Sequence, residues 1–304
     1  MKFKKITSIL LTAVCVMSMA ACGTKGDSDS GSGGGDSGSG DKGGAGSSAT
    51  TAKVIDIDLT DEEYAFGVDK SQPELLEQVN AFVGKIKEDG TLEEICDKYF
   101  GDGEPTAVES AELDTSKDQL VVATNAAFEP FEYTKGESYY GIDMEIASML
   151  AEELNKELVI QNMDFDAVCL SVSQQKCDIA MAGLTINEER EEYVTFTDSY
   201  YSASQRLIVP DGDTAFDDCA DADAVADLLG KLGESDIIGV QAGTTGQYYV
   251  EGDEDWEFDG LPAQCQTYKS GSLAVQDMLN GNIKYVIIDA APAAAITEAI
   301  NEMQ

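Results

Sequence analysis

The segment from Asp178 to Arg190, with the sequence DIAMAGLTINEER, decides the fold class. Asp178 to Ala182 is a short apolar run typical of a buried strand, and Gly183 to Thr185 would be its exposed end. Asn187 to Arg190 has the residues of the first turn of a short helix. This order directs strand-end backbone groups, a hydroxyl and a guanidinium at one small volume. It predicts a binding site at the end of a strand in an α/β protein.

Arg190 is one of only two arginines in a chain with 58 acidic and 19 basic residues. A planar guanidinium can hold a carboxylate with two parallel hydrogen bonds, which lysine cannot do. The alternative is a surface salt bridge with Glu188 or Glu191.

Strand and helix patterns alternate from Gln119 to Ile300, which predicts parallel sheets with helices on both faces. Tyr200 to Val209 is expected to be a long hinge strand between two halves. The expected strands are 119–124, 158–163, 178–182, 237–241 and 285–288, and the expected helices are 142–154, 167–175, 223–232, 245–250, 273–279 and 293–300.

The segment before this body predicts further elements. Strands are expected at 54–58 and 64–68, and amphipathic helices at 73–88, opened by Pro73, and at 92–99. Residues 101–117 form a polar, acidic connector.

The formal net charge is −39 and the chain has no histidine. Such a charge argues against binding to nucleic acid or to anionic lipid by electrostatics. The lack of histidine removes the commonest general base and metal ligand, and we predict no cofactor and no metal site.

The N-terminus has the pattern of a secretory signal. Lys2, Lys4 and Lys5 precede an apolar run from Ile6 to Ala21, which is too short to span a bilayer. Met19 to Cys22 resembles the lipobox of bacterial lipoproteins, which would make Cys22 a lipid anchor. Ordinary cleavage beside an incidental cysteine is the alternative. We therefore expect a signal peptide at 1–21, a flexible tether rich in Gly, Ser and Asp at 22–52, and an extracytoplasmic, membrane-anchored protein.

Beyond Cys22 the chain has five cysteines with no metal-binding spacing. Buried thiols and a disulfide of unidentified pairing both remain open. These residues are Cys96, Cys169, Cys177, Cys219 and Cys265.

Six motifs in consistent order resemble the extracytoplasmic amino-acid-binding proteins of ABC importers. They are AFEPFEY (127–133), GIDM (141–144), NMDF (162–165), AGLTINEER (182–190), GVQAGTT (239–245) and VIID (286–289). The resemblance implies the α/β, two-lobed periplasmic-binding-protein fold, type II-like, with two parallel-sheet lobes joined by hinge strands. We expect lobe 1 at 61–203 and lobe 2 at 53–60 and 204–304.

One departure concerns the order of the chain. Residues 62–70 and 89–101 resemble the end of such a protein, yet here they come before the body. We predict a circular permutation in which residues 101–117 join the family's usual termini. A remnant of a duplicated neighbour is the alternative.

The resemblance also implies roles for individual residues. Arg190 would hold the α-carboxylate of a free amino acid, together with the N–H groups of Thr244 and Thr245, whose alternative role is helix capping. Asp289 would pair with the ammonium group, beside the Gly183 carbonyl and the Thr185 hydroxyl, or would cap a helix. The other expected ligand-binding residues are Asn125, Phe128, Phe165, Leu184 and Gln241.

Phe128 and Phe165 would enclose the ligand's side chain, and Asn125, Gln241 and Ile288 would line its far end. Relatives that prefer basic or amide ligands often carry an acid where Asn125 stands. The neutral Asn125 therefore favours a polar, uncharged L-amino acid.

The resulting hypothesis is a binding protein, expected to be a monomer without enzymatic activity, that closes around a free amino acid and delivers it to an ABC transporter permease. A dehydratase-like enzyme on the same scaffold and a ligand-sensing domain are the alternatives.

Overall fold

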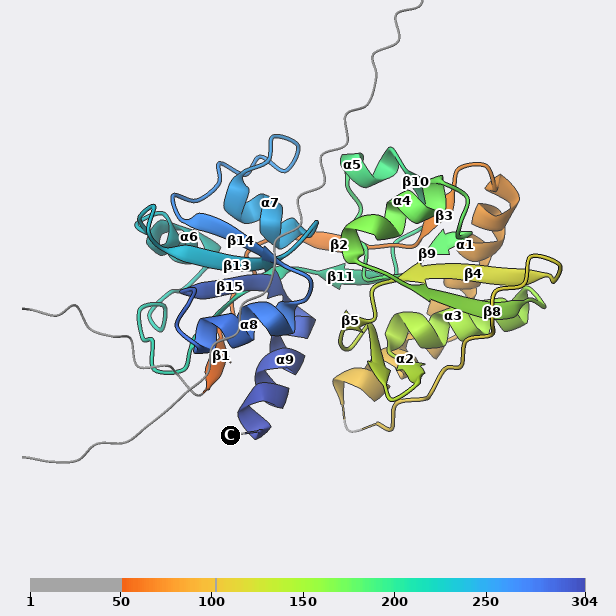
Figure 1. Cartoon of the computed structure of the whole chain (residues 1–304), viewed down its shortest axis with the longest axis horizontal. Coiled ribbons are helices and arrows are strands. Elements are labelled where there is room, and N and C mark those ends of the chain that lie inside the picture. The colour runs from red at the N-terminus through yellow and green to blue at the C-terminus, as the bar shows by residue number, and fades with distance from the viewer. Residues whose placement is uncertain (1–50, 102, 304) are drawn as a thin grey trace, which may run out of the picture. The chain divides into compact units, whose positions relative to one another are not determined.

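The strands assemble into two five-stranded sheets in the computed structural model, which describes residues 51–101 and 103–303 (Figure 1). The fold is α/β, as predicted. These described residues group into one compact unit, so the division into two lobes stays a prediction. The predicted signal peptide, Cys22 and nearly all of the tether lie outside the described residues.

The first sheet has the strand order β1-β12-β15-β13-β14. β13 pairs in parallel with β14 and β15, whereas β12 pairs antiparallel with β1 and β15. The strands are β1 (Ala52–Val54), β12 (Gln205–Pro210), β13 (Ile237–Gln241), β14 (Gln264–Tyr268) and β15 (Tyr285–Asp289). The helices that accompany them are α6 (Ala222–Leu229), α7 (Thr245–Glu251), α8 (Gly271–Leu279) and α9 (Ala290–Glu302).

The second sheet has the order β10-β3-β9-β4-β8, with β4 parallel to β8 and β9 and with β3 antiparallel to β9 and β10. Its strands are β3 (Gly67–Asp69), β4 (Gln119–Thr124), β8 (Glu157–Asn162), β9 (Ile179–Ala180) and β10 (Val194–Phe196). Its helices are α1 (Pro73–Glu88), α2 (Thr91–Phe100), α3 (Ile142–Glu153), η1 (Phe165–Ala167), α4 (Val168–Ser173) and α5 (Glu188–Glu191).

Two smaller elements complete the fold. β5 (Ala127–Phe128), β6 (Glu132–Lys135) and β7 (Ser138–Tyr140) form an antiparallel three-stranded sheet. β2 (Glu62–Tyr64) and β11 (Tyr201–Ala203) pair antiparallel as a ribbon, and Figure 1 shows this ribbon between the two five-stranded sheets. We call β2 and β11 the hinge ribbon.

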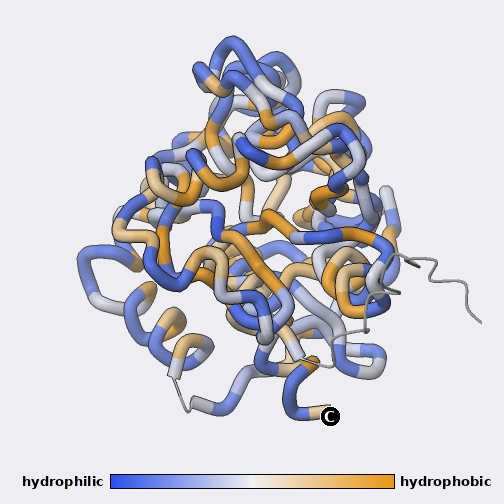
Figure 2. The backbone as a smooth tube through the Cα atoms, turned by 90° about the vertical axis from the view of Figure 1, so that its left-hand side faces the viewer, coloured by the Kyte–Doolittle hydropathy of each residue, from blue (hydrophilic) through white to orange (hydrophobic). Residues whose placement is uncertain are grey.

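Helix α1 shows why the elements form where the sequence predicts them. Pro73 stands at its first turn, where no backbone N–H is needed. Lys85 and Lys87 in the last turn complement the helix dipole. The buried residues of α1 recur at helical spacing and face the core. They are Leu75, Val79, Phe82, Val83 and Ile86. Figure 2 shows the core of the molecule as hydrophobic backbone segments enclosed by hydrophilic ones.

The prediction of purely parallel sheets is wrong, because both sheets are mixed. Strands that continue from the hinge ribbon enter each sheet against the direction of its parallel strands: β12 follows β11, and β3 follows β2. The long strand predicted at Tyr200–Val209 is accordingly divided into β11 and β12.

Two N-terminal strands also differ from their predicted extents. β1 ends at Val54, because the Ile57 N–H leaves the ladder and donates to the Ile55 carbonyl at 2.8 Å; Asp56 and Asp58 beside this turn pair with Arg206 on β12. The strand predicted over 64–68 is broken at Ala65, whose N–H donates to the Leu184 carbonyl where the chain leaves the ribbon. The short strand β14 and the sheet β5-β6-β7 were not predicted.

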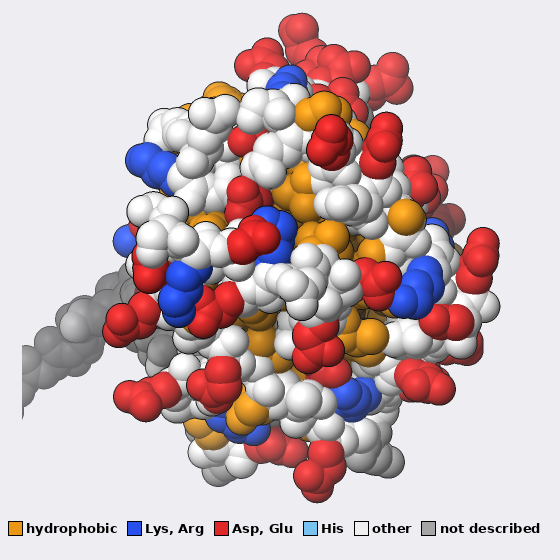
Figure 3. Space-filling model, turned by 90° about the vertical axis from the view of Figure 1, so that its right-hand side faces the viewer, with side chains coloured by type: hydrophobic (Ala, Val, Ile, Leu, Met, Phe, Trp, Pro, Cys, Tyr) orange, Lys and Arg blue, Asp and Glu red, His pale blue; other side chains and the backbone are white. Residues whose placement is uncertain are grey.

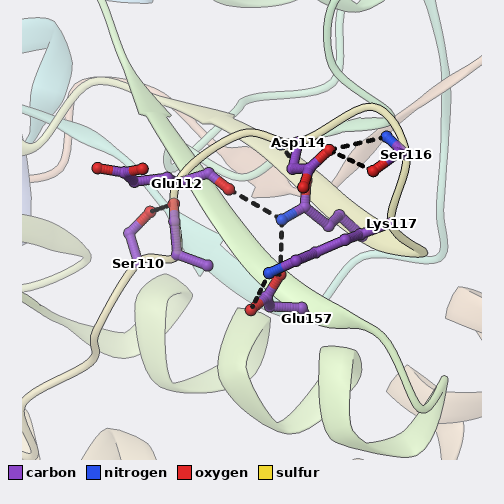
Figure 4. A network of polar contacts seen from close by, with 8 residues as sticks. Ser110, Glu112, Asp114, Ser116, Lys117 and Glu157 are labelled. Atoms are coloured by element: carbon purple, nitrogen blue, oxygen red, sulfur yellow. Dashed lines mark hydrogen bonds and ion pairs between the residues drawn. The ribbon is translucent and has the colours of Figure 1, made fainter.

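The connector between α2 and β4 is fixed to the second sheet by a polar network (Figure 4). Gln119 donates to the Glu112 carbonyl (2.9 Å) and to the Glu157 carboxylate (2.7 Å), and it accepts from the Asp114 N–H (2.8 Å). Lys117 forms an ion pair with Glu157 at 3.0 Å. The connector therefore follows the edge of β8.

The surface is strongly acidic. Figure 3 shows carboxylates spread over one face, with few lysine and arginine side chains among them. Among the described residues, all five cysteines are free, and no helix has the length and apolar character needed to cross a membrane.

Candidate functional site

Arg190 is held inside the protein, with 7% of its surface exposed. Asn187 caps α5 by accepting from the Arg190 N–H at 2.8 Å, which fixes the start of the side chain. The guanidinium donates to two carbonyls, of Thr185 (2.6 Å) and Gly243 (3.0 Å), and its Cζ lies 5.2 Å from the centre of the Phe165 ring. It forms no ion pair with any described residue, so the alternative of a salt bridge with Glu188 or Glu191 is wrong.

Thr185 and Asp289 both contact the hinge ribbon strand β2, where Thr185 forms an isolated β-bridge with Tyr64. The Thr185 hydroxyl donates to Glu62 at 2.7 Å, which leaves its oxygen lone pairs free to accept. Asp289 ends β15, is 4% exposed, and accepts from the Tyr64 hydroxyl at 2.5 Å. Asp289 occupies the N-cap position of α9, but its side chain makes no capping bond. Asp289 therefore stands at the capping position of the helix, but its carboxylate does not cap the helix.

Gly183 is the position of the predicted segment where only glycine fits. Its φ is +53°, in the left-handed region, and a Cβ there would lie 2.9 Å from the Phe128 ring. Its N–H donates to Asp143 at 2.9 Å, and Asp143 also accepts from the Tyr200 hydroxyl at 2.5 Å. The turn after β9 is thus fixed by a buried carboxylate.

Asn125 and Gln241 meet as a pair of carboxamides. The Gln241 Nε2 donates to the Asn125 Oδ1 at 3.1 Å, and the Asn125 Nδ2 donates to the Met163 carbonyl at 2.6 Å. The Gln241 Oε1 is buried and has no hydrogen-bond partner among the described residues. This oxygen is therefore a hydrogen-bond acceptor that the described side chains leave available.

Thr244 and Thr245 open α7, with Thr244 at the N-cap position. The Thr244 hydroxyl donates to the Gln241 carbonyl at 2.8 Å and makes no capping bond, and the buried Thr245 hydroxyl has no partner among the described residues. Helix capping therefore does not account for these two side chains.

The remaining predicted residues differ in their placement. The Phe128 ring lies against Gly183, and Phe165 lies beside Arg190. The Leu184 side chain is buried in a hydrophobic cluster and its carbonyl accepts from the Ala65 N–H, so only its own N–H remains for a ligand.

Buried carboxylates set the electrostatics around this region. Burial raises the pKa of Asp143 to about 7. Burial and the neighbouring Glu62 raise the pKa of Asp289 to about 7, against the Tyr64 hydrogen bond, which lowers it. Burial also raises the pKa of Glu132 well above its ordinary value, with Asp143 and Asp289 adding to the shift, and both Glu132 oxygens lack partners in the described chain.

Cavities do not mark the predicted site. A groove of about 530 Å³ lies between Ala126 and Tyr133 on one side and α8 and α9 on the other, and another of about 770 Å³ lies between the connector and α4. Neither is lined by Arg190 or Asp289. The contact of Arg190 with Gly243 and that of Asn125 with Gln241 close the space between the predicted residues.

The structure adds residues that the motifs did not predict. Glu62 and Tyr64 come from the hinge ribbon, more than 100 positions before Thr185 and Asp289, and no local pattern connects them. Asp143 lies in the GIDM motif, but its sequence does not reveal the contact with Gly183. No group of three or more His, Cys, Asp or Glu residues in the described ranges could hold a metal ion.

The comparisons with known proteins agree with the fold. The family model for bacterial extracellular solute-binding proteins, family 3, matches residues 5–102 and 120–303. The arginine-binding extracellular protein ArtP of Bacillus subtilis (strain 168) is 32% identical over 131 residues, which cover 43% of this chain and 47% of ArtP. The arginine-binding periplasmic protein of Mannheimia haemolytica is 29% identical over 177 residues, covering 58% and 65%. The chain thus spans about half to two thirds of the length of these relatives.

A solved structure gives the same picture. An ancestral arginine-binding protein bound to arginine superposes with a TM-score of 0.50 and 26% identity, over 60% of this chain and 75% of the other.

Proposed function

Because the chain belongs to family 3 of the bacterial extracellular solute-binding proteins, we propose that it binds a free L-amino acid and delivers it to an ABC transporter permease. The relatives named above for arginine binding support the ligand class. The ligand would lie between Arg190 and Asp289.

The observation that carries the proposal is the state of Arg190. It is a buried cation that faces two neutral carbonyls and no carboxylate of the described chain. Burying a charge without an opposite charge is costly, and an α-carboxylate would supply that charge with bidentate geometry. Asp289 offers the opposite charge for the ammonium group of the same ligand.

The other predicted residues receive roles around these two poles. The N–H groups of Thr244 and Thr245 would add donors to the carboxylate, while the Gly183 carbonyl and the Thr185 oxygen would accept from the ammonium. Phe128, Phe165 and the N–H of Leu184 would line the space between. Asn125 and Gln241 would face the end of the ligand's side chain.

The carboxamide pair supports a polar, uncharged amino acid. The Gln241 Oε1 would accept a hydrogen bond from the ligand's side chain, and the described contacts of Asn125 and Gln241 include no carboxylate that would pair with a guanidinium. Arginine and histidine are the competing ligands, because relatives carry those names.

Binding would require the two halves of the fold to separate and close again. Outside the carboxamide pair and Arg190, two polar side-chain contacts among the described residues join elements of the two sheets: Tyr248 donates to Glu189 at 2.7 Å, and Lys269 pairs with Asp164 at 2.9 Å. The hinge ribbon is the shared connection. We assign residues 61–203 to one lobe, and residues 53–60 and 204–304 to the other.

We further propose that the chain is circularly permuted. The family model matches two segments separated at 103–119, where the connector lies, and the curated relatives match only part of the chain. Residues 51–54 and the end of α9, which would be consecutive in the usual order, lie side by side. These observations favour permutation over a duplicated remnant.

Secretion and lipidation of Cys22 would place the protein outside the cytoplasm as a membrane-anchored monomer. Mass spectrometry of the mature N-terminal peptide tests this step: acylated Cys22 is expected, and an unmodified cysteine would refute the anchor.

The central test is calorimetric titration of residues 51–304 with each common amino acid. One polar amino acid is expected to bind. At 100 times its Kd it should increase the free energy of unfolding by about 2.7 kcal/mol and thereby raise the melting temperature. If none of the amino acids binds, the proposed function is wrong.

An enzyme on this scaffold is the second candidate, because Asp289 and Asp143 have pKa values of about 7 and could serve as general acids. Incubation of the protein with its ligand, followed by chromatography, distinguishes the two. Unchanged ligand supports a binding protein, and a product that increases with time supports the enzyme.

A further inference from the structure

Tyr64 in the hinge ribbon and Tyr200 directly beside it are neighbours, and their hydroxyls extend toward different halves of the fold. Tyr64 ends β2, and Tyr200 directly precedes β11. The Tyr200 N–H donates to the Tyr64 carbonyl at 2.9 Å, and the two ring centres are 6.4 Å apart. Both rings are buried.

The Tyr64 hydroxyl reaches the first sheet. It donates to Asp289 at the end of β15, and Asp289 makes no capping bond to α9. The groups that face Asp289 come from several elements: Glu62 and Tyr64 on β2, Gln205 on β12, Glu132 on β6 and Tyr201 on β11. Two of these are carboxylates and none is a cation, so Tyr64 is a principal donor that stabilises the ionised Asp289.

The Tyr200 hydroxyl reaches α3, a helix of the second sheet. It donates to Asp143 at 2.5 Å, and the second Asp143 oxygen accepts from the Gly183 N–H at 2.9 Å. Tyr200 is itself fixed by stacking on Phe66, with the ring centres 4.4 Å apart. The Ala182–Gly183 peptide group, next to the one that carries the Gly183 carbonyl, is therefore oriented by a chain of hydrogen bonds that begins at Tyr200 beside the ribbon.

We propose that Tyr64 and Tyr200 are positioning residues: Tyr64 orients Asp289, and Tyr200, through Asp143, orients Gly183, so that both groups face the ammonium of the bound amino acid. The inference rests on the proposed function. It makes the hinge ribbon part of the binding machinery, since the same two strands connect the sheets and hold one ammonium-binding group in each.

The protonation of Asp289 gives this role a distinct signature. Its pKa of about 7 results from burial and Glu62 and is lowered by the Tyr64 hydroxyl. Only the ionised carboxylate pairs with an ammonium, so affinity is expected to fall as the pH decreases through the range near 7. Removing the hydroxyl raises the pKa of Asp289 further and moves that fall to higher pH.

The experiment measures Kd by calorimetry between pH 5.5 and pH 8.5 for wild-type, Tyr64→Phe and Tyr200→Phe proteins. Each variant is expected to bind about tenfold more weakly or worse at pH 7, because a buried charged acceptor loses its donor. In Tyr64→Phe the midpoint of the pH profile also moves upward by about one unit. Tyr139→Phe is the matched control, because Tyr139 lies on β7, outside the ribbon, and its hydroxyl makes no hydrogen bond to a described residue.

The double variant Tyr64→Phe/Asp289→Asn shows whether Tyr64 acts through Asp289. If it does, adding Tyr64→Phe to Asp289→Asn costs little further affinity. Additive losses, or a Tyr64→Phe profile with an unchanged midpoint, would overturn the inference. Failure of the wild-type protein to bind any amino acid would instead overturn the proposed function.

A fluorinated tyrosine at position 64 covers the case in which Tyr64→Phe does not fold. 3-Fluorotyrosine keeps the ring and has a more acidic hydroxyl, hence a stronger donor. The midpoint is expected to move to lower pH, and an unchanged midpoint would again contradict the role of Tyr64.

Discussion

Ala52 and Asn301 are 249 positions apart and exchange two hydrogen bonds: the Ala52 N–H donates to the Asn301 Oδ1 at 3.0 Å, and the Asn301 Nδ2 donates to the Ala52 carbonyl at 2.9 Å. One residue begins β1 and the other lies in the last turn of α9. The two ends of the folded region therefore lie at one place on the first sheet.

A chain cut again at the connector is expected to fold and bind as before. This variant begins at residue 103 and ends at residue 102, with residue 304 joined to residue 51 by a short glycine linker, so the connector and its buried Val108 are kept. No core contact is lost, because Ala52 and Asn301 already touch. Circular dichroism melting and Kd are the measurements.

The matched control is a cut between Val121 and Val122 inside β4, which is paired on both sides and should not be interrupted. That variant is expected to be unfolded. If the chain cut at the connector fails in the same way, the permutation is wrong.

Arg190→Ala is expected to weaken amino-acid binding by about 100-fold or more, because the α-carboxylate would lose its charge-assisted partner. The melting temperature without ligand should change little. Arg206→Ala is the control, since Arg206 is the chain's other arginine and pairs with Asp56 and Asp58 at the surface. A loss of many degrees in Arg190→Ala without ligand would show that the residue is structural.

Gly183→Ala is expected to lower the free energy of unfolding by about 2–4 kcal/mol, from the left-handed backbone together with a contact of 2.9 Å to the Phe128 ring. Gly136→Ala separates the two causes, because Gly136 also has a positive φ (+69°) but no atom within 4 Å of an added Cβ. It should cost only the backbone part, about 1–2 kcal/mol. Urea unfolding gives both free energies. Equal losses in the two variants would show that the contact with the Phe128 ring adds nothing to the cost.

The ligand-free protein is expected to become more stable as the pH falls from about 8 to 5. Asp143 and Asp289 have folded-state pKa values of about 7 against 3.8 in the unfolded chain, so the folded state binds protons first. Unfolding free energy then decreases as the pH rises between these values, by up to about 4 kcal/mol per group.

Asp143→Asn should flatten this pH profile. It removes the ionisation and keeps an oxygen that can accept from the Gly183 N–H. A variant that melts with the wild-type pH dependence would show that Asp143 does not titrate in this range.

Asn125→Asp is expected to shift the preference toward basic amino acids, because a carboxylate would replace the carboxamide oxygen that faces Gln241. The ratio of Kd values for arginine and glutamine measures the shift. Asn162→Asp is the control, since Asn162 accepts from the Ala126 N–H nearby. The same ratio in both variants would place the ligand's side chain elsewhere.

Local sequence was sufficient for most elements of the fold. Strong periodicity and capping residues predicted β4 and α1 with the observed bounds, and Asn187 was predicted to open the helix that carries Arg190. These features depend on neighbours a few residues apart, which a single sequence displays.

The directions of the strands and the contacts between the hinge ribbon and the candidate site depend on residues that are distant in sequence. Nothing near β12 indicates that it runs against β15, because its direction follows from the ribbon. The contact of Thr185 with Glu62 spans 123 positions, and that of Tyr64 with Asp289 spans 225. Such pairs arise only when the whole chain is assembled.

The two hydrogen bonds between Ala52 and Asn301 also affect how the protein would respond to mechanical load. β1 is a three-residue edge strand whose ladder to β12 begins at Ala52. Tension applied from the N-terminal side would reach the start of β1 first, and there both backbone groups of Ala52 are bonded to the Asn301 side chain of α9. The Asn301 side chain of α9 would therefore bear part of the force before the hydrogen bonds between β1 and β12 could break one after another.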